Sequence, residues 1–223
     1  MSVSQLSAST QNYLKAIWSL GEWSDDPITP TALSKYLGLR VSSVSDAVRK
    51  MADQGLIEHA PYGSVKLTVQ GDEYAVAMVR RHRLIETFLV TALDYSWDQV
   101  HDEAENLEHA VSDFMVTRID EFLQHPTLDP HGDPIPGPTG EVADSTAVQL
   151  SALHDDIPAR IERISDRDPG LLQHFSAHGV GIGAVVETKP GAPYSGAVEL
   201  HVHGGEVLTL GADALDAVWV VPC

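Results

Sequence analysis

The stretch that decides the fold of the N-terminal part is TALSKYLGLRVSSVSDAVRKMADQGLIEH, residues 31–59. It predicts a short helix over 31–37 that ends at Gly38, because glycine readily takes the left-handed conformation that closes a helix. After the turn 39–41, a second helix is predicted over 42–54, with an apolar side made by Val44, Ala47, Val48 and Met51. Two short helices joined by a glycine-containing turn are typical of the helix-turn-helix motif.

The segments on either side extend this motif to a winged helix. Residues 56–68, LIEHAPYGSVKLT, form two strand-like runs around Pro61-Tyr62-Gly63, which predicts a hairpin, the wing. Upstream, a first helix is predicted with Ser9 or Thr10 as its cap and an apolar face of Tyr13, Leu14, Ile17 and Trp18. We therefore expect a winged helix-turn-helix DNA-binding domain over residues 1–73.

The helix over 42–54 begins with small polar side chains, which suit entry into the major groove of DNA. Basic residues around it would meet phosphates, and an acidic residue there could accept a hydrogen bond from cytosine. A helical bundle with solvated Ser and Lys is the alternative. The residues expected to contact DNA are Arg40, Ser42, Ser43, Ser45, Asp46, Arg49, Lys50 and, on the wing, Lys66.

The rest of the chain is predicted to be helical first and β-rich last. Apolar residues at three- and four-residue spacing predict a helix over 69–92 and one or two more over 96–123, with Ser96 as a cap. Five of the thirteen prolines lie between 126 and 138, which predicts a partly ordered linker over 124–158. Short β-runs with glycine turns after residue 159 predict a small barrel. The fold class is mainly α with a small β part.

Composition places limits on the class of protein. The 223 residues are 43% hydrophobic and contain no run of about 18 apolar residues, so no transmembrane helix is predicted. The N-terminus lacks the pattern of a signal peptide, and Cys223 is the single cysteine, so we expect a cytoplasmic protein without intramolecular disulfides. The net charge of -18 resides in residues 82–223, because residues 1–81 hold eight basic and eight acidic residues. An acidic body either repels DNA phosphates or collects cations, and composition does not decide which.

Two consecutive helices carry His and Glu residues in a pattern that suits a cation. His82 and Glu86, in RRHRLIE, are spaced to share one helix face. In HDEAENLEH, residues 101–109, four such side chains project within an arc of roughly 80–100°. Imidazole and carboxylate together suit Mn, Fe, Co, Ni or Zn, with Mn favoured as oxygen ligands increase. These four residues are His101, Glu105, Glu108 and His109.

Single His-x-x-x-Glu pairs are often solvated helix surface, but two features favour a metal here. No Lys or Arg occurs between residues 84 and 117, and the carboxylates of Glu103, Glu105 and Glu108 would repel one another without a cation. Seven of the remaining histidines are interpreted as residues without a ligand role, and most as surface residues: His125, His131, His154, His174, His178, His201 and His203.

These motifs carry a resemblance to a known family. The order of the winged helix, RRHRLIE, VHDEAENLEHAVSD and DPHGDPIPG resembles the diphtheria toxin repressor family of iron- and manganese-dependent repressors, over almost the whole chain. The resemblance implies a helical dimerisation and metal-binding domain over 74–145 and an SH3-like (FeoA-like) domain over 156–223. It further implies a transcriptional repressor rather than an enzyme: a homodimer that, when metal-loaded, binds palindromic operator DNA and controls metal homeostasis genes, without a membrane partner.

The resemblance also implies two metal sites per chain. The first would use His82, Glu86 and His101, completed by Glu162 and Asp166. The second, activating site would use Glu105, Glu108, His109 and, from the first helix, Asn12.

The identity of residue 105 points to the metal. Its position is Cys in iron-type members and Glu in manganese-type ones, so Mn²⁺ is expected, with Fe²⁺, Co²⁺ and Zn²⁺ as alternatives. Asn12 stands where better-known members have Met or Asp and offers only an amide oxygen. Asp129 and Asp133 stand at the family's anion-binding pair, so no anion is expected there. The rival hypotheses are a di-metal hydrolase, since such ligand sets also serve hydrolases, and a metal-independent DNA-binding protein.

Overall fold

The computed structural model describes residues 3–24, 26–59, 63–143 and 145–223. The chain divides into two compact units, and each is described by itself. The first comprises Met1–Ile85, Glu105–Thr127 and Ile135–Val142. The second comprises Glu86–Ala104, Leu128–Pro134 and Ala143–Cys223.

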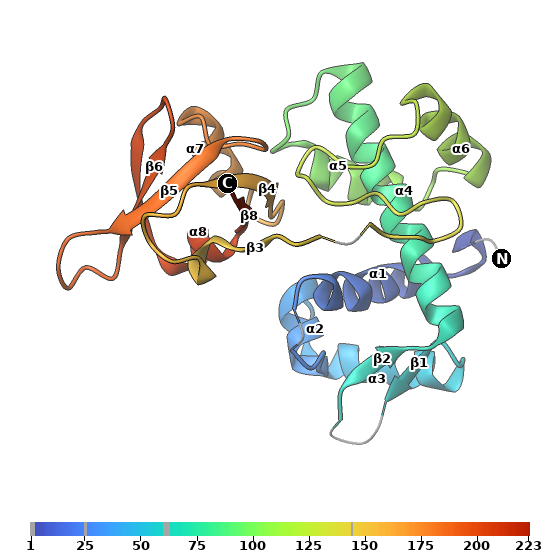
Figure 1. The fold of residues 1–223 in the computed structure, drawn as a ribbon. Helices are drawn as coiled ribbons and strands as arrows, with labels where there is room; N and C mark the ends of the chain where they lie inside the picture. The colour runs from blue at the N-terminus through green and yellow to red at the C-terminus, as the bar shows by residue number, and fades with distance from the viewer. Residues whose placement is uncertain (1–2, 25, 60–62, 144) are drawn as a thin grey trace. The chain divides into compact units, whose positions relative to one another are not determined.

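The first unit begins with the expected winged helix (Figure 1). Its elements are the 3-10 helix η1 (Val3–Gln5), α1 (Ala8–Glu22), α2 (Pro30–Leu37), α3 (Val41–Asp53) and the strands β1 (Ile57–His59) and β2 (Val65–Leu67). Gly38 closes α2 at a φ of 65°, which confirms the predicted stop. The cap of α1 was predicted wrongly: Ser7, not Ser9 or Thr10, accepts the hydrogen bond from Thr10 N.

A single apolar core holds the winged helix together. Leu14 and Ile17 of α1 are buried with Leu33 of α2 and Val44 and Met51 of α3. β1 and β2 pair antiparallel with Ile57 opposite Leu67, as the hairpin prediction requires. Residues 60–62 of the predicted turn lie outside the described residues. Because the apolar side of α3 faces this core, the polar start of α3 remains exposed.

Three helices follow the wing: α4 (Val69–Leu93), α5 (Val100–Leu107) and α6 (Asp113–Phe122). The prediction of Ser96 as a helix cap is wrong, because residues 97–99 form a turn and α5 begins at Val100. Ser112 caps α6 instead, accepting a hydrogen bond from Met115 N. None of the helices in the described ranges is long and apolar enough to cross a membrane.

The C-terminal part of the second unit is a six-stranded antiparallel sheet in the order β3-β8-β4-β5-β6-β7 (Figure 1). Leu200, Val186 and Phe175 lie in its apolar core. The predicted β-rich end is confirmed, but among the described residues β3 and β7 are edge strands, so the barrel is not closed. The elements are β3 (Val148–Gln149), η2 (Leu150–Ala152), β4 (Ala159–Ile164), α7 (Pro169–Ala177), β5 (Val185–Pro190), β6 (Val198–Val202), β7 (Val207–Leu210), α8 (Ala212–Asp216) and β8 (Val218–Pro222).

The Pro-rich segment is ordered, which corrects the linker prediction. Residues 131–136 are all buried, and an isolated bridge joins Leu128 to Pro134. The carboxylate of Asp129 accepts hydrogen bonds from the backbone N–H groups of His131 and Asp133 at 2.9 Å. Gly132 has a φ of 86°, and a Cβ there would lie 1.9 Å from the carbonyl oxygen of Glu162 on β4. Only glycine allows this close approach, which fixes the segment against the sheet.

Candidate metal centre

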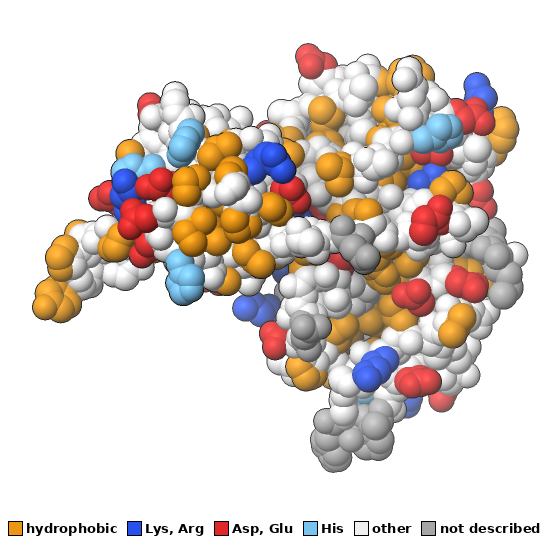
Figure 2. Space-filling model, viewed as in Figure 1, with side chains coloured by type: hydrophobic (Ala, Val, Ile, Leu, Met, Phe, Trp, Pro, Cys, Tyr) orange, Lys and Arg blue, Asp and Glu red, His pale blue; other side chains and the backbone are white. Residues whose placement is uncertain are grey.

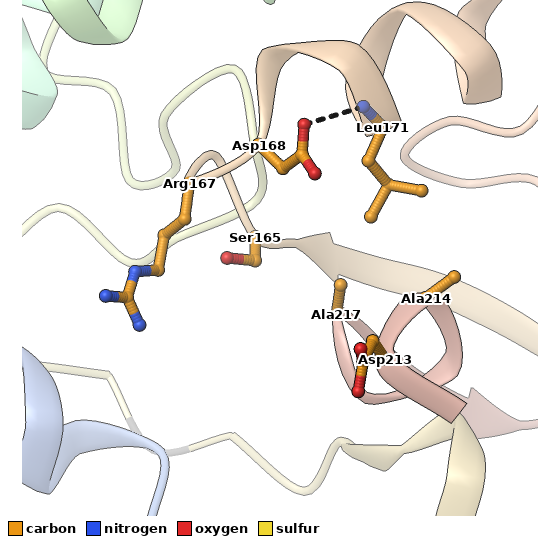
Figure 3. A pocket seen from close by; sticks show the side chains of 7 residues that line it. All are labelled: Ser165, Arg167, Asp168, Leu171, Asp213, Ala214 and Ala217. Carbon is orange, nitrogen blue, oxygen red and sulfur yellow. Dashed lines mark hydrogen bonds between the residues drawn. The ribbon is translucent and has the colours of Figure 1, made fainter. Parts of the chain in front are cut away.

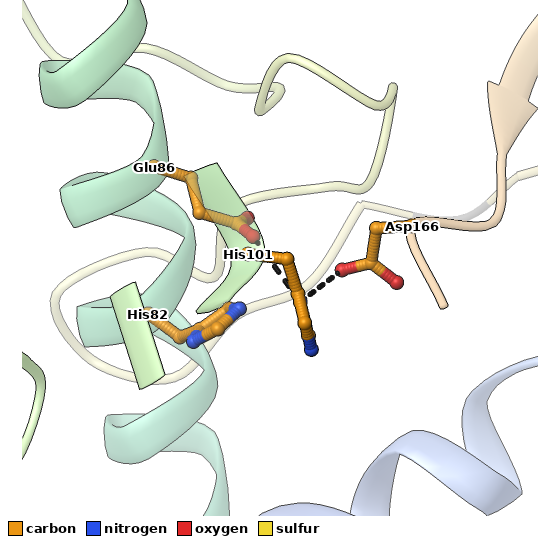
Figure 4. A group of neighbouring side chains, drawn as sticks. All are labelled: His82, Glu86, His101 and Asp166. Carbon is orange, nitrogen blue, oxygen red and sulfur yellow. Dashed lines mark ion pairs between the residues drawn. The ribbon is translucent and has the colours of Figure 1, made fainter. Parts of the chain in front are cut away.

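Three side chains of the second unit converge around His101 on α5. Its Nδ1 lies 2.8 Å from a carboxylate oxygen of Asp166 and 3.5 Å from Oε1 of Glu86 on α4 (Figure 4). The three residues offer ligand atoms within 4.8 Å of one another. Glu86 is fully buried and Asp166 is half-buried. Two carboxylates and an imidazole at this spacing make a donor set that suits a divalent cation.

The electrostatics of this group favour positive charge. Burial works against protonation of His101, but its contacts with Asp166 and Glu86 outweigh burial and raise the pKa of the imidazole to about 11. A proton on His101 therefore partly neutralises the two carboxylates in the chain without metal. A bound cation would supply that charge instead, with His101 as a neutral ligand.

His131 joins the same group, although the sequence interpretation placed it on the surface. It is fully buried, and its Nε2 lies 2.7 Å from the carbonyl oxygen of Trp97. A carbonyl only accepts, so Nε2 carries a proton, and a metal would find its ligand atom at Nδ1. Among the described residues Nδ1 has no hydrogen-bond partner and lies 3.9 Å from Oε2 of Glu86. His131, Glu86 and the buried Asp129 form a second overlapping set of ligand atoms.

One feature of the sequence could have indicated a buried position for His131. The segment DPHGDP couples a histidine to a glycine, and Gly132 is the residue that lets the chain pack against β4. The backbone carbonyl of His131 accepts a hydrogen bond from Ile164 N at 2.9 Å, which anchors the histidine at the sheet.

Two other residues were predicted for the first site, Glu162 and His82, and both have contacts elsewhere. Glu162 is on β4 with its carboxylate 3.5 Å from Arg160, and the structure does not bring it into either carboxylate–histidine set. His82 lies one helical turn before Glu86 on α4, as predicted. Its Nδ1, however, lies 2.6 Å from Oε2 of Glu108, a residue predicted for the second site.

The second predicted site lies in the first unit and contains an internal cation. Lys15 of α1 donates hydrogen bonds to Glu105 at 2.5 Å and to both carboxylate oxygens of Glu108 at 2.7 and 2.8 Å. Its Nζ also lies 3.2 Å from Nδ1 of His82. Lys15 was not predicted at this site, because it lies ninety residues before Glu105 and outside the stretch between residues 84 and 117 that lacks Lys and Arg.

Charges within this group stabilise one another. Burial lowers the pKa of Lys15, but the carboxylates of Glu108 and Glu105 outweigh burial and raise it above its ordinary value. Burial raises the pKa of Glu108, but contacts with His82 and Lys15 outweigh that effect and lower it. Glu108 is therefore an anion held by Lys15, with its side chain fully buried.

His109 and Asn12 offer unused ligand atoms beside this group. Gln11 donates through its Nε2 to the carbonyls of Val3 and Leu6, so its Oε1 accepts from Nδ1 of His109 at 2.6 Å. Nδ1 therefore carries a proton, and Nε2, which lies 3.6 Å from Oε1 of Glu108, is the ring atom that a metal would use. Among the described residues neither His109 Nε2 nor the buried Oδ1 of Asn12 has a hydrogen-bond partner.

The residues predicted to contact DNA lie on α3 and its N-cap and, for Lys66, on the wing. Ser42 and Ser43 are exposed, whereas Ser45 is half-buried and donates from Oγ to the carbonyl of Val41 at 2.9 Å. Asp46 lies 3.4 Å from Arg49 in an exposed ion pair. On the face shown in Figure 2, blue Lys and Arg side chains stand apart from one another among red acidic ones. The remaining predicted contacts, Arg40, Lys50 and Lys66, are also exposed.

Comparison with known proteins identifies the family to which this chain belongs. The iron-dependent repressor IdeR of Mycobacterium leprae is 31% identical over 95% of this chain and 96% of its own length. The diphtheria toxin repressor of Corynebacterium glutamicum is 32% identical over 80% of this chain and 82% of its own. The chain belongs to the diphtheria toxin repressor family. This is a family of metal-dependent, DNA-binding transcriptional repressors and not of enzymes, so the hydrolase hypothesis is set aside.

Three family models match successive segments of this repressor chain. Residues 5–65 match the N-terminal DNA-binding domain of iron-dependent repressors. Residues 68–137 match their metal-binding and dimerisation domain, and residues 148–222 match the FeoA domain. The model for 68–137 contains Glu86, His101 and His131 and also Glu105 and Glu108, so both groups described above involve its residues.

Solved structures add information on the metal. A manganese-dependent transcriptional repressor in complex with manganese is 44% identical, with a TM-score of 0.87 over 96% of this chain and 100% of that one. The manganese regulator SloR is 29% identical, with a TM-score of 0.81 over 96% of this chain and 98% of that one.

A pocket in the second unit carries no comparable chemistry. It is lined by residues of the segment 165–171 and of α8 and its C-cap, including Asp168, Asp213 and Arg167 (Figure 3). Asp168 is occupied as the N-cap of α7, where it accepts from Leu171 N at 3.1 Å. None of the lining residues belongs to the carboxylate–histidine sets.

Proposed function

We propose that this family member is a manganese-dependent repressor with two metal sites per chain. The observation that carries the proposal is the convergence of carboxylates with three imidazoles, of which His131 and His109 each have a ring nitrogen without a hydrogen-bond partner among the described residues. The first site would use Glu86, His101, Asp166 and His131, with Asp129 beside them. The second would use Glu105, Glu108, His109 and Asn12. His82 was predicted for the first site, and we propose it as a ligand of either site, since one turn of α4 separates it from Glu86 and its Nδ1 contacts Glu108.

The donor atoms support manganese as the metal. Each site offers at least two carboxylates beside imidazole, and neither contains a thiolate, since Cys223 is the single cysteine. Hard oxygen donors suit Mn²⁺ better than soft sulfur donors do. The manganese-dependent repressor of similar structure supports the same choice. Fe²⁺, Co²⁺ and Zn²⁺ remain competitors.

The second site would couple metal binding to DNA binding. Asn12 and Lys15 lie on α1, whose Leu14 and Ile17 are part of the winged-helix core. Glu105 and Glu108 lie on or beside α5 in the same unit. A cation bound there would neutralise the carboxylates and tie α1 to them. The chain's own core would then transmit the position of α1 to α3 and its exposed Ser42 and Ser43.

Operator recognition would require a dimer. Large apolar side chains are exposed on α6, including Phe114 at 76% and Phe122 at 61%. Exposed aromatic residues clustered on one helix support a subunit interface. We propose a winged-helix domain over 1–73, a dimerisation and metal-binding domain over 74–145 and an SH3-like domain over 156–223. A two-fold dimer would read a palindromic operator in genes of metal homeostasis.

The test is metal-dependent binding to a duplex selected from random sequence by the Mn²⁺-loaded protein. We expect Mn²⁺ to tighten binding by about 5- to 150-fold over chelator, the usual range for coupling between two sites. Mobility-shift titrations with and without chelator measure this ratio. Mg²⁺ at the same concentration controls for general screening of charge. Equal affinity in chelator and in Mn²⁺ would contradict the proposal.

Glu105→Cys is expected to change metal preference. A thiolate at this position favours Co²⁺, Fe²⁺ or Zn²⁺, so the Mn²⁺ concentration for half-maximal DNA binding should rise relative to Co²⁺ by on the order of tenfold. The measurement compares Mn²⁺, Co²⁺ and Fe²⁺ under anaerobic conditions. Glu103→Cys, on the same helix, is the matched control. An unchanged ratio between the metals would show that Glu105 does not contact the ion.

A further inference from the structure

We propose that the Lys15 ammonium occupies the second metal site in the metal-free chain and competes with the incoming cation, so that Lys15 sets the metal concentration at which the repressor responds. The inference rests on the proposed function, because it requires that Glu105 and Glu108 bind metal. It adds a role for a residue that is not a ligand.

The first step is that Lys15 holds the atoms that a metal would need. Its Nζ is within 2.8 Å of three carboxylate oxygens, one on Glu105 and both on Glu108. An ammonium group has three protons to donate, and here each can meet a carboxylate oxygen. The side chain of Lys15 is only 11% exposed, so water does not readily replace these contacts.

The second step is that the ammonium and a metal exclude each other. Divalent cations bind carboxylate oxygens at about 2.0–2.6 Å, so an ion that used all three of these oxygens would lie close to Nζ, which is itself within 2.8 Å of each of them. Two positive charges at that distance in a partly buried site repel strongly. The ammonium must therefore leave before a cation can use Glu105 and Glu108. The long aliphatic part of Lys15 allows its charged end to move toward solvent without displacing α1.

The third step is that Arg81, the other described Lys or Arg shown to contact Glu108, does not bind its carboxylate. Arg81 also approaches Glu108, but its guanidinium donates to the backbone carbonyl at 3.0 Å and pairs with the carboxylate of Asp113. Arg81 thus fixes the end of α5 and leaves the carboxylate of Glu108 to Lys15 and His82. Removal of the Lys15 charge would leave two carboxylates close together, and these would attract a dication more strongly.

The fourth step connects competition to the switch. Asn12 precedes Lys15 by three residues on α1, so the two side chains share one face of the helix. The Oδ1 of Asn12 is buried and has no hydrogen-bond partner among the described residues. Departure of Lys15 would clear the position that this oxygen needs to reach a cation. In the metal-free chain the ammonium of Lys15 holds α1 to the carboxylates, whereas in the metal-bound chain Asn12 and the cation would hold it, so the contact that fixes the position of α1 changes.

Lys15→Met tests the competition in the full-length protein. Methionine keeps the length and apolar character of the side chain and removes its charge. We expect calorimetric titration with MnCl₂ to show that the affinity for Mn²⁺ increases about tenfold or more at one site and does not change at the other. The reason is that the ammonium no longer has to be displaced before the carboxylates can bind the ion. Lys35→Met, an exposed lysine of α2, is the matched control. Unchanged or weaker Mn²⁺ affinity in Lys15→Met overturns the proposal.

A second measurement uses the wild-type chain and so does not depend on how the variant folds. In chelator, Lys15 should resist acetylation by an amine-reactive ester compared with Lys35, as read by peptide mass spectrometry. Saturating Mn²⁺ should increase acetylation of Lys15 and leave Lys35 unchanged. Equal labelling of Lys15 with and without Mn²⁺ overturns the proposal. If the wild type binds no Mn²⁺ in the calorimeter, the proposed function itself fails, which is a separate result.

Discussion

Glu86→Gln is expected to weaken Mn²⁺ binding at the first site by roughly 150- to 5,000-fold while the protein remains folded. The Glu86 carboxylate is fully buried and lies between His101 at 3.5 Å and His131 at 3.9 Å. Glutamine keeps its shape but supplies no negative charge. Removal of one partner from a buried ionic group costs about 3–5 kcal/mol, which corresponds to that loss of affinity.

The measurement is competition between the protein and a coloured chelator for Mn²⁺, with metal content per chain determined in parallel. One equivalent should be lost in the variant. Glu103→Gln, which removes the same charge from a half-buried position on α5, should keep both equivalents. If Glu86→Gln retained wild-type affinity at both sites, the first site would have to be assigned to other residues.

His131→Phe would add a sharper test of the same site. Phenylalanine preserves an aromatic ring beside Trp97, with which His131 stacks at a centroid distance of 6.0 Å, but it has no ligand atom. A loss of affinity on the order of tenfold or more is expected if Nδ1 binds the metal. If this variant bound Mn²⁺ with wild-type affinity, His131 would not be a metal ligand and its role would be structural.

Local patterns predicted most of the helices and strands of this fold. The helix stop at Gly38 and the pairing of Ile57 with Leu67 depend on residues close together in the sequence, and both were predicted. The cap of α1 was misplaced by two or three residues because Ser7, Ser9 and Thr10 are all good capping residues. Only the hydrogen bond from Thr10 N to Ser7 decides among them.

What the sequence did not predict depends on contacts between distant segments. The Pro-rich segment has the composition of a linker, yet Gly132 packs on the carbonyl of Glu162, thirty residues later. That contact buries His131 and makes it a ligand candidate. Lys15 precedes Glu105 by ninety residues, so no pattern within the α4–α5 region could show that a cation already lies there. Spacing along a helix identifies which face carries the ligands, but it does not identify the residues from distant segments that contact this face.

Ser43→Glu is expected to abolish site-specific DNA binding and to leave metal binding intact. Ser43 is exposed in the first turn of α3, the helix that we propose enters the major groove, and it lies within the segment that matches the family's DNA-binding domain. A glutamate there would place a charge against base edges and phosphates with no partner. Affinity should fall to the non-specific level, a loss of at least about 1,000-fold.

The two functions should separate because they use different residues of the chain. The metal ligands proposed for the second site lie on α1 and on or beside α5, whereas Ser43 contributes no ligand atom and belongs to none of the carboxylate–histidine sets. Operator binding by fluorescence anisotropy in Mn²⁺ and metal titration by calorimetry should therefore give opposite answers for Ser43→Glu, a large loss in the first and none in the second. Ser151→Glu adds the same charge at an exposed position of the second unit and should change neither quantity. Metal affinity that fell together with DNA affinity in Ser43→Glu would mean that α3 and the metal group unfold or rearrange as one element. In that case the proposal that coupling runs through α1 would have to be replaced by one in which the winged helix as a whole determines the geometry of the metal site.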